Sequence, residues 1–129
     1  MTRKLKVLVV EDELLTARCI CEDLKDLDTE PLQPVPKGET AVEVALNEEP
    51  DLILMDIRLA GGMDGIEAAI EIHKKKEIPV IFMSGFATEY IIKKANVVEY
   101  IEFFEKPVTI DFLRPVINKL KKNNGHLIQ

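Results

Sequence analysis

Three carboxylic acids, one hydroxyl and one lysine stand directly after short apolar runs of this sequence. In chain order they are Glu11, Asp12, Asp56, Ser84 and Lys106. Carboxylates that lie close together repel one another, and each is driven toward protonation unless a cation neutralises it. Because the candidate ligands offer only oxygen, with no His or Cys among them, a Mg²⁺ ion is favoured over zinc. A Mg²⁺ ion also keeps coordination positions that a phosphate oxygen can fill.

A carboxylate in such a site could attack phosphorus and form an aspartyl phosphate. Asp56 is the best candidate because it ends a central apolar run and precedes a loop, residues 57–64, where a phosphoryl donor could approach. Lys106 would balance the charge of the phosphoryl oxygens, and Ser84 could donate a hydrogen bond to one of them. The residue types and their order therefore predict a site that accepts a phosphoryl group.

The elements that must position these residues alternate between strand and helix. Residues 7–10, 52–55 and 80–83 are continuous apolar runs, which are typical of strands buried on both faces of a parallel sheet. Apolar residues at helical spacing, together with two weaker strands, complete five β-α units. The helices are expected at about residues 14–27, 39–47, 65–75, 87–95 and 109–122, and the weaker strands at 30–36 and 100–104.

This alternation predicts an α/β fold, a doubly wound sheet of five parallel strands with helices on both faces. In the flavodoxin-like strand order 2-1-3-4-5, the second strand lies at an edge of the sheet. Residues 30–36 suit an edge because Pro31, Pro34 and Pro36 cannot donate to a sheet ladder. Pro115 lies inside the last helical pattern and would remove one helical hydrogen bond unless that helix begins later.

The length of 129 residues predicts one domain, residues 1–129, with a core at about 4–122 and a polar tail at 123–129. The formal net charge of −6 offers no basic surface for gripping nucleic acid, so no direct nucleic-acid partner is expected. No segment approaches the roughly 20 consecutive apolar residues that a membrane helix needs. We therefore expect no membrane partner and a cytoplasmic location.

Five short motifs together resemble the receiver domain of two-component response regulators, and in particular the chemotaxis-regulator type, over residues 4–122. The motifs are Val-Val-Glu-Asp-Glu at 9–13, Leu-Met-Asp-Ile at 54–57, Gly-Met-Asp-Gly at 62–65, Met-Ser-Gly at 83–85 and Phe-Glu-Lys-Pro at 104–107. The resemblance implies that Asp56 is the phosphoacceptor and that Mg²⁺ is the cofactor. The implied direct metal ligands are Asp12, Asp56 and the backbone carbonyl of Arg58, and Glu11 would act on the metal largely through water. The implied phosphate-binding groups are Ser84, the Gly85 amide and Lys106.

The resemblance also implies a conformational switch. Ser84 would move toward the phosphoryl group, and Phe103 would rotate into the space that Ser84 leaves. The Lys106–Pro107 peptide bond would be cis, which X-Pro bonds allow at a small energetic cost. The surface formed by the fourth helix, fifth strand and fifth helix would then change in response to phosphorylation.

The implied partners are a sensor histidine kinase or a phosphotransfer protein as donor, and a downstream protein or fused effector domain as recipient of the signal. A homodimer through the face of the fourth helix, fifth strand and fifth helix is also expected. The chain would be a signalling phosphoacceptor and not an enzyme of metabolic turnover. It would still catalyse its own phosphoryl transfer and a slow autodephosphorylation.

Two other functions stay open at this point. A pseudo-receiver keeps the fold as an interaction module without phosphorylation, but it usually lacks an acid or the lysine, all of which are present here. A small phosphatase with an aspartate nucleophile, of the haloacid-dehalogenase type, would carry a second aspartate where this chain has Arg58.

The sequence departs from the commonest receiver pattern at four positions. Glu11 replaces a frequent aspartate, and Phe103 lacks the hydroxyl of a frequent tyrosine. Arg58 and Phe86 flank the expected phosphate entrance, where they would affect how fast water reaches the acyl phosphate.

Overall fold

The computed structural model describes residues 3–123, in which five strands alternate with five helices. The elements are β1 (Lys6–Val10), α1 (Leu14–Asp26), β2 (Glu30–Pro31), α2 (Gly38–Glu48), β3 (Leu52–Asp56), α3 (Gly65–His73), β4 (Val80–Ser84), α4 (Glu89–Ala95), β5 (Glu102–Glu105) and α5 (Ile110–Asn123). The predicted core at 4–122 falls within the described residues. The predicted polar tail lies outside them, except for Asn123 at the end of α5.

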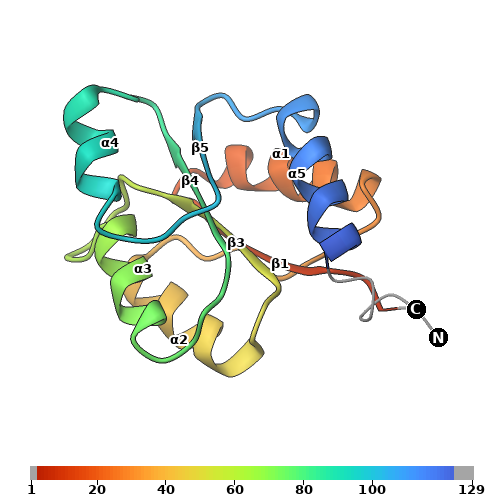
Figure 1. Cartoon of the computed structure of the whole chain (residues 1–129), viewed down its shortest axis with the longest axis horizontal. Coiled ribbons are helices and arrows are strands. Elements are labelled where there is room, and N and C mark those ends of the chain that lie inside the picture. Colours follow the sequence, from red (N-terminus) through yellow and green to blue (C-terminus); the bar gives the residue numbers. More distant parts are fainter. Residues whose placement is uncertain (1–2, 124–129) are drawn as a thin grey trace.

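The strands form one parallel sheet in the order β2-β1-β3-β4-β5, which confirms the predicted topology. Figure 1 shows α1 and α5 on one side of the sheet and α2, α3 and α4 on the other. The register aligns Val10 with Met55 and Asp56 with Met83. Because the strands are parallel and in this register, the residues that end β1, β3 and β4 meet along the carboxyl ends of the strands, which we call the carboxyl edge of the sheet.

The core lies on both faces of the sheet, as continuous apolar strands require. Leu8, Met55 and Phe82 are fully buried toward the helices on one face. Val9, Leu54 and Met83 alternate with them and are fully buried toward α1 and α5 on the other. Complete burial of one such side chain stabilises the fold by roughly 1.5–3 kcal/mol, so the central strands are the rigid base of the site.

The second strand is much shorter than the predicted 30–36. β2 contains only two residues, Glu30 and Pro31, and a single isolated bridge joins Val35 to Val10. Since Pro34 and Pro36 have no backbone N–H, they cannot continue the ladder, and the chain leaves the sheet between the two contacts. Its position at the edge agrees with the prediction.

The last helix continues through Pro115 instead of beginning after it. Pro115 is the sixth residue of α5, so the hydrogen bond that it removes is the one to the carbonyl of Asp111, in the first turn. Packing of Leu113, Ile117 and Leu120 into the core holds the rest of the helix in place. No helix within residues 3–123 is long and apolar enough to span a membrane.

Candidate functional site

A pocket of about 240 Å³ opens at the carboxyl edge of the sheet, where the predicted site residues meet. Its lining residues come from the ends of β1, β3, β4 and β5 and from the loops that follow. They are Glu11, Asp12, Glu13, Asp56, Arg58, Ser84, Gly85, Phe86 and Lys106. All the predicted metal-binding and phosphate-binding residues are therefore in one place, whereas Phe103, the predicted switch residue, does not line the pocket.

Asp56 lies on the floor of this pocket as the last residue of β3. Only 3% of its surface is exposed. Lys106 Nζ donates to its Oδ2 atom at 2.8 Å, and the backbone N–H of Arg58 donates to its Oδ1 atom at 3.3 Å. Both carboxylate oxygens are thus held by donors that also suit a phosphoryl group.

Lys106 joins the two buried acids of the pocket. Its Nζ atom lies 2.6 Å from Glu11 Oε1 as well as 2.8 Å from Asp56 Oδ2. Burial lowers the pKa of the lysine, but the contacts with Asp56 and Glu11 outweigh burial and raise it overall. The backbone N–H of Lys106 donates to the Ser84 carbonyl at 2.8 Å, and the following peptide bond to Pro107 is cis. Lys106 is therefore a fully charged ammonium group, held at the carboxyl edge by β4.

Among the described residues, Glu11 carries the one buried side-chain polar atom that has no hydrogen-bond partner. Its Oε2 atom accepts a hydrogen bond from the backbone N–H of Glu13 at 3.1 Å. Its buried Oε1 atom receives no hydrogen bond of good geometry, although the Lys106 ammonium is close. Burial raises the pKa of Glu11 to about 7, and the negative charge of Asp56 adds to this effect while Lys106 opposes it. The Oε1 atom is thus paired with the Lys106 ammonium by charge but lacks a well-formed hydrogen bond.

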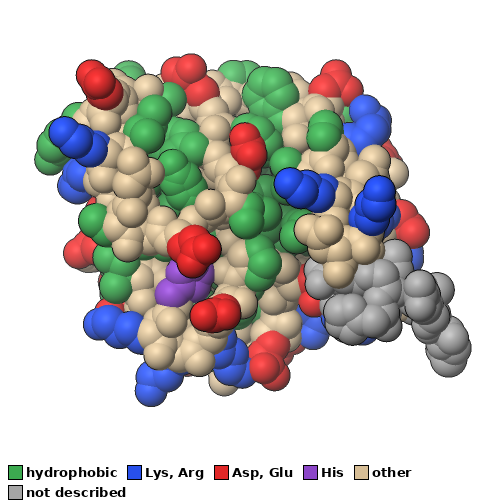
Figure 2. All heavy atoms as spheres, viewed as in Figure 1, with side chains coloured by type: hydrophobic (Ala, Val, Ile, Leu, Met, Phe, Trp, Pro, Cys, Tyr) green, Lys and Arg blue, Asp and Glu red, His purple; other side chains and the backbone are tan. Residues whose placement is uncertain are grey.

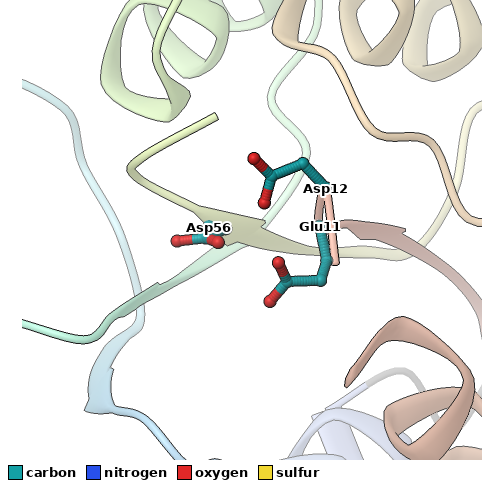
Figure 3. Close-up of side chains that lie close together, drawn as sticks. All are labelled: Glu11, Asp12 and Asp56. Atoms are coloured by element: carbon teal, nitrogen blue, oxygen red, sulfur yellow. The ribbon is translucent and has the colours of Figure 1, made fainter. Parts of the chain in front are cut away.

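The three acids of the pocket fit a divalent cation. Glu11, Asp12 and Asp56 each offer one carboxylate oxygen, and these atoms lie within 4.8 Å of one another. Figure 3 shows the three carboxylates around a common space at the ends of β1 and β3. Two of the acids are buried while Asp12 is exposed, so a cation could enter from the Asp12 side. Oxygen ligands at this spacing suit Mg²⁺.

The Ser84 hydroxyl is engaged within its own loop. It donates to the Phe86 carbonyl at 3.0 Å and accepts from the Phe86 backbone N–H at 3.1 Å. Space around Gly85 is open, since a Cβ atom placed on it would meet nothing within 4 Å. Phe103 is half-buried, and its ring centroid lies 6.5 Å from that of Phe82 and 6.2 Å from that of Tyr100.

Gly65 positions the loop after Asp56, a role that the sequence reasoning missed. The Gly65 N–H donates to the Ile57 carbonyl at 2.8 Å, which brings the start of α3 against β3. A Cβ atom on Gly65 would collide with the Asp56 carbonyl oxygen and lie 2.8 Å from Met55 Cγ. Only glycine permits this close approach of backbone to backbone.

A capping box fixes the same helix start. The Asp64 side chain accepts from the Glu67 N–H, and the Glu67 side chain accepts from the Asp64 N–H. An acid at the cap followed by Glu three residues later is a recognisable helix-start signal, so this contact could have been found from the sequence. The cap holds the far end of the loop that carries Arg58.

Comparisons with known proteins agree on one family. The profile of the response regulator receiver domain matches residues 7–118. The transcriptional regulatory protein PdtaR of Mycobacterium tuberculosis is 32% identical over 112 residues, which are 87% of this chain and 54% of PdtaR. The sensory transduction protein LytT of Bacillus subtilis is 27% identical over 126 residues, or 97% of this chain and 52% of LytT. The chain thus spans about half the length of these relatives.

Solved structures give the same result. The signal receiver domain of a modulated diguanylate cyclase from Desulfovibrio desulfuricans has a TM-score of 0.85 at 30% identity, covering 95% of this chain and 98% of that one. The receiver domain of the sensor histidine kinase PA1611 from Pseudomonas aeruginosa has a TM-score of 0.81 at 25% identity, covering 91% and 97% of the two chains. That structure holds a magnesium ion coordinated in its active site cleft. This chain belongs to the response regulator receiver domain family of two-component signal transduction.

Proposed function

We propose that Asp56 accepts a phosphoryl group from a phosphohistidine of a sensor kinase or phosphotransfer protein. One Asp56 carboxylate oxygen forms a bond to phosphorus, and the bond between phosphorus and the donor's imidazole nitrogen breaks. The electron pair of that bond stays with the nitrogen. The product is a phosphoaspartate, which water later hydrolyses slowly, so the chain acts in signalling and not in metabolic turnover.

One observation carries this proposal: the floor of the pocket holds Asp56 between a lysine donor and two further acids. The Lys106 ammonium, 2.8 Å from Asp56 Oδ2, lies where it can neutralise a phosphoryl oxygen. The Ser84 hydroxyl and the open Gly85 backbone border the same pocket and would complete the phosphate contacts. Packing alone does not explain why two of these acids, Glu11 and Asp56, are each only 3% exposed.

Glu11, Asp12, Asp56 and the Arg58 carbonyl would hold Mg²⁺ in this site. When bound, the ion would neutralise the acids and the charge of the incoming phosphoryl group. Glu11 brings a buried oxygen without a hydrogen bond, and Asp12 brings an exposed carboxylate near it. Both acids would gain a cationic partner in addition to what the protein supplies, which for Glu11 is the shared Lys106 ammonium.

The signal would leave the site through Ser84 and Phe103. For its hydroxyl to reach a phosphoryl group, Ser84 must give up its two hydrogen bonds to the Phe86 backbone. The half-buried Phe103 ring would then turn inward against Phe82, which changes the surface of α4, β5 and α5. The equilibrium between the two states shifts by as much as the phosphoryl contacts favour one of them.

The face of α4, β5 and α5 is the proposed output surface, and it would bind a downstream protein, a fused effector or a second copy of the chain. Figure 2 shows hydrophobic side chains gathered between the two helices on this face. A groove of about 390 Å³ there is lined in part by Ile101, Pro115 and Val116. Sedimentation with and without a phosphate mimic tests the homodimer, and an unchanged monomer would refute it.

Phosphorylation is tested by incubating the chain with acetyl phosphate, with and without Mg²⁺, and following intact mass. We expect a metal-dependent gain of one phosphoryl group that is lost in Asp56→Asn. A pseudo-receiver would gain nothing under any condition while staying folded by circular dichroism. A phosphatase of the haloacid-dehalogenase type would release phosphate from many monoesters at rates that a signalling domain does not reach.

A further inference from the structure

Two exposed residues that line the phosphoacceptor pocket lie against each other. Asp56 at the floor is 3% exposed, whereas Phe86 at the rim is 61% exposed and Arg58 is also exposed. The guanidinium carbon of Arg58 lies 5.3 Å from the centroid of the Phe86 ring. An arginine at this distance from an aromatic face is attracted to it. Because both side chains line the pocket, their contact joins its β3 side to its β4 side.

Ser84 at the end of β4 holds the backbone of Phe86 in place. Its hydroxyl makes two hydrogen bonds with the backbone of Phe86, one to the carbonyl and one from the N–H. These bonds fix the backbone from which the Phe86 ring projects. On the other strand, the Arg58 backbone N–H donates to Asp56 Oδ1, the carboxylate that is to be phosphorylated. The backbones of Arg58 and Phe86 are therefore each hydrogen-bonded to a residue, Asp56 or Ser84, that must change its contacts during phosphorylation.

We infer that Arg58 and Phe86 form a lid over Asp56 that the Ser84 hydroxyl holds shut, so that movement of Ser84 toward a phosphoryl group releases the lid. This inference rests on the proposed phosphorylation of Asp56. The lid lowers the fraction of molecules open to a donor before transfer, and the apparent rate falls with that fraction. The lid therefore selects against small donors that make no contact with Arg58 or Phe86. Once the phosphoaspartate has formed, Ser84 has moved and the lid is already released.

The lid predicts an asymmetry between gain and loss of phosphate. An exposed cation–π pair is worth about 0.5–1 kcal/mol, which corresponds to about a two- to fivefold change in an open population. Phe86→Leu keeps an apolar side chain but removes the aromatic face. We expect it to speed phosphorylation by acetyl phosphate about two- to fivefold and to change phosphoaspartate hydrolysis by a smaller factor, because the lid is already released in the phosphorylated state.

A double-mutant cycle separates the lid from the charge of the arginine. Arg58→Gln alters attraction of the anionic donor as well as the lid, but in its background Phe86→Leu should have no further effect. Tyr90→Leu is the matched control, because Lys94 Nζ lies 5.4 Å from the Tyr90 ring on α4, away from the pocket. It should leave the phosphorylation rate at the wild-type value.

Equal acceleration by Phe86→Leu in both backgrounds would overturn the lid, as would a wild-type rate in Phe86→Leu or an equal gain in Tyr90→Leu. If the wild type itself gains no phosphoryl group, the proposed function fails and amide exchange decides the lid. Arg58→Gln should then speed hydrogen exchange of the Phe86 amide about two- to fivefold, because loss of the lid weakens its bond to Ser84. An unchanged exchange rate refutes the coupling.

Discussion

One acid lies at each end of β3, Asp51 directly before the strand and Asp56 as its last residue, and their surroundings differ. At the amino end, Asp51 accepts two hydrogen bonds from the Arg3 guanidinium, at 2.8 and 2.9 Å, and one from the Lys6 N–H at 2.8 Å. At the carboxyl end, Asp56 shares the single ammonium group of Lys106 with Glu11. One acid has a complete set of donors, and the other competes for an incomplete one.

The acid before β3 is placed to stabilise the fold, whereas the acid at the end of β3 is placed to bind ligands. Asp51 pairs one carboxylate with one bidentate guanidinium, an arrangement that balances charge and geometry. Three carboxylates face one ammonium group at the other end, so negative charge is in excess there. Under the proposed function, binding of a cation and a phosphoryl group would explain why the site keeps this excess at a cost in stability.

The largest expected effect concerns the backbone at the carboxyl end. In Gly65→Ala the new Cβ would collide with the Asp56 carbonyl, so strand and loop must move apart. We expect a loss of about 3 kcal/mol or more in the free energy of unfolding. Urea denaturation measures it.

Gly85→Ala is the control for that substitution, since its Cβ would enter open space. It should change stability by no more than about 0.5 kcal/mol. Equal losses in the two variants would show that close packing at Asp56 is not what sets the carboxyl end apart.

At the amino end, Asp51→Asn removes the charge that Arg3 and the Lys6 N–H bind. We expect a loss of about 2 kcal/mol at pH 7. Burial acts to raise the pKa of Asp51, but Arg3 and the Lys6 N–H outweigh it, so the folded-state pKa is lowered. The stabilisation is therefore present above pH of about 4 and is lost as pH falls through the folded-state pKa.

Denaturation of wild type and Asp51→Asn at a series of pH values tests whether the stabilisation by Asp51 is lost in acid. Their stabilities should converge in acid. A difference that instead grew as pH fell would contradict the assignment of Asp51 as the satisfied acid of β3.

Mg²⁺ should stabilise only through the carboxyl end. At ten times its dissociation constant it adds about 1.4 kcal/mol to the free energy of unfolding. Asp12→Asn, which changes an exposed acid of the cluster, should lose most of this gain, and Asp51→Asn should keep it. Thermal melts with and without Mg²⁺ measure the shift; equal shifts in both variants would place the cation elsewhere.

The smallest expected change in the free energy of unfolding is a gain, in Asp56→Asn, where Asp51→Asn gives a loss. Asp56→Asn removes one of the excess charges and leaves Lys106 to Glu11, so without metal we expect a gain of roughly 1 kcal/mol. The same substitution at the two ends of one strand should thus destabilise at Asp51 and stabilise at Asp56. A clear loss at Asp56 would remove the distinction between the two acids.

The apolar runs predicted the parallel strands and the pocket residues, whereas the strand order was taken from the flavodoxin-like pattern. Continuous apolar runs identify buried parallel strands, and polar residues that follow such runs meet at one edge. Asp56 and Lys106 were therefore predictable although 50 residues separate them. The family membership was also predicted from the motifs around them.

Contacts that involve loops and the segments before strands were not predictable in this way. The pairing of Arg3 with Asp51 depends on how the segment before β1 approaches the turn before β3, and no periodicity in the chain indicates it. The Ser84 contacts to Phe86 depend on the path of one loop after β4. The length of β2 was overestimated because a proline-rich segment can run beside a strand and pair with it at only a few positions.

The short second strand has a consequence for how these molecules meet one another. An exposed sheet edge can recruit a strand from a second chain and lead to aggregation. Here one edge ends after Pro31, and the other carries exposed glutamates at both ends of β5, Glu102 and Glu105. Proline withholds donors at the first edge and charge repels a neighbour at the second, so association is directed away from backbone pairing and toward side-chain surfaces.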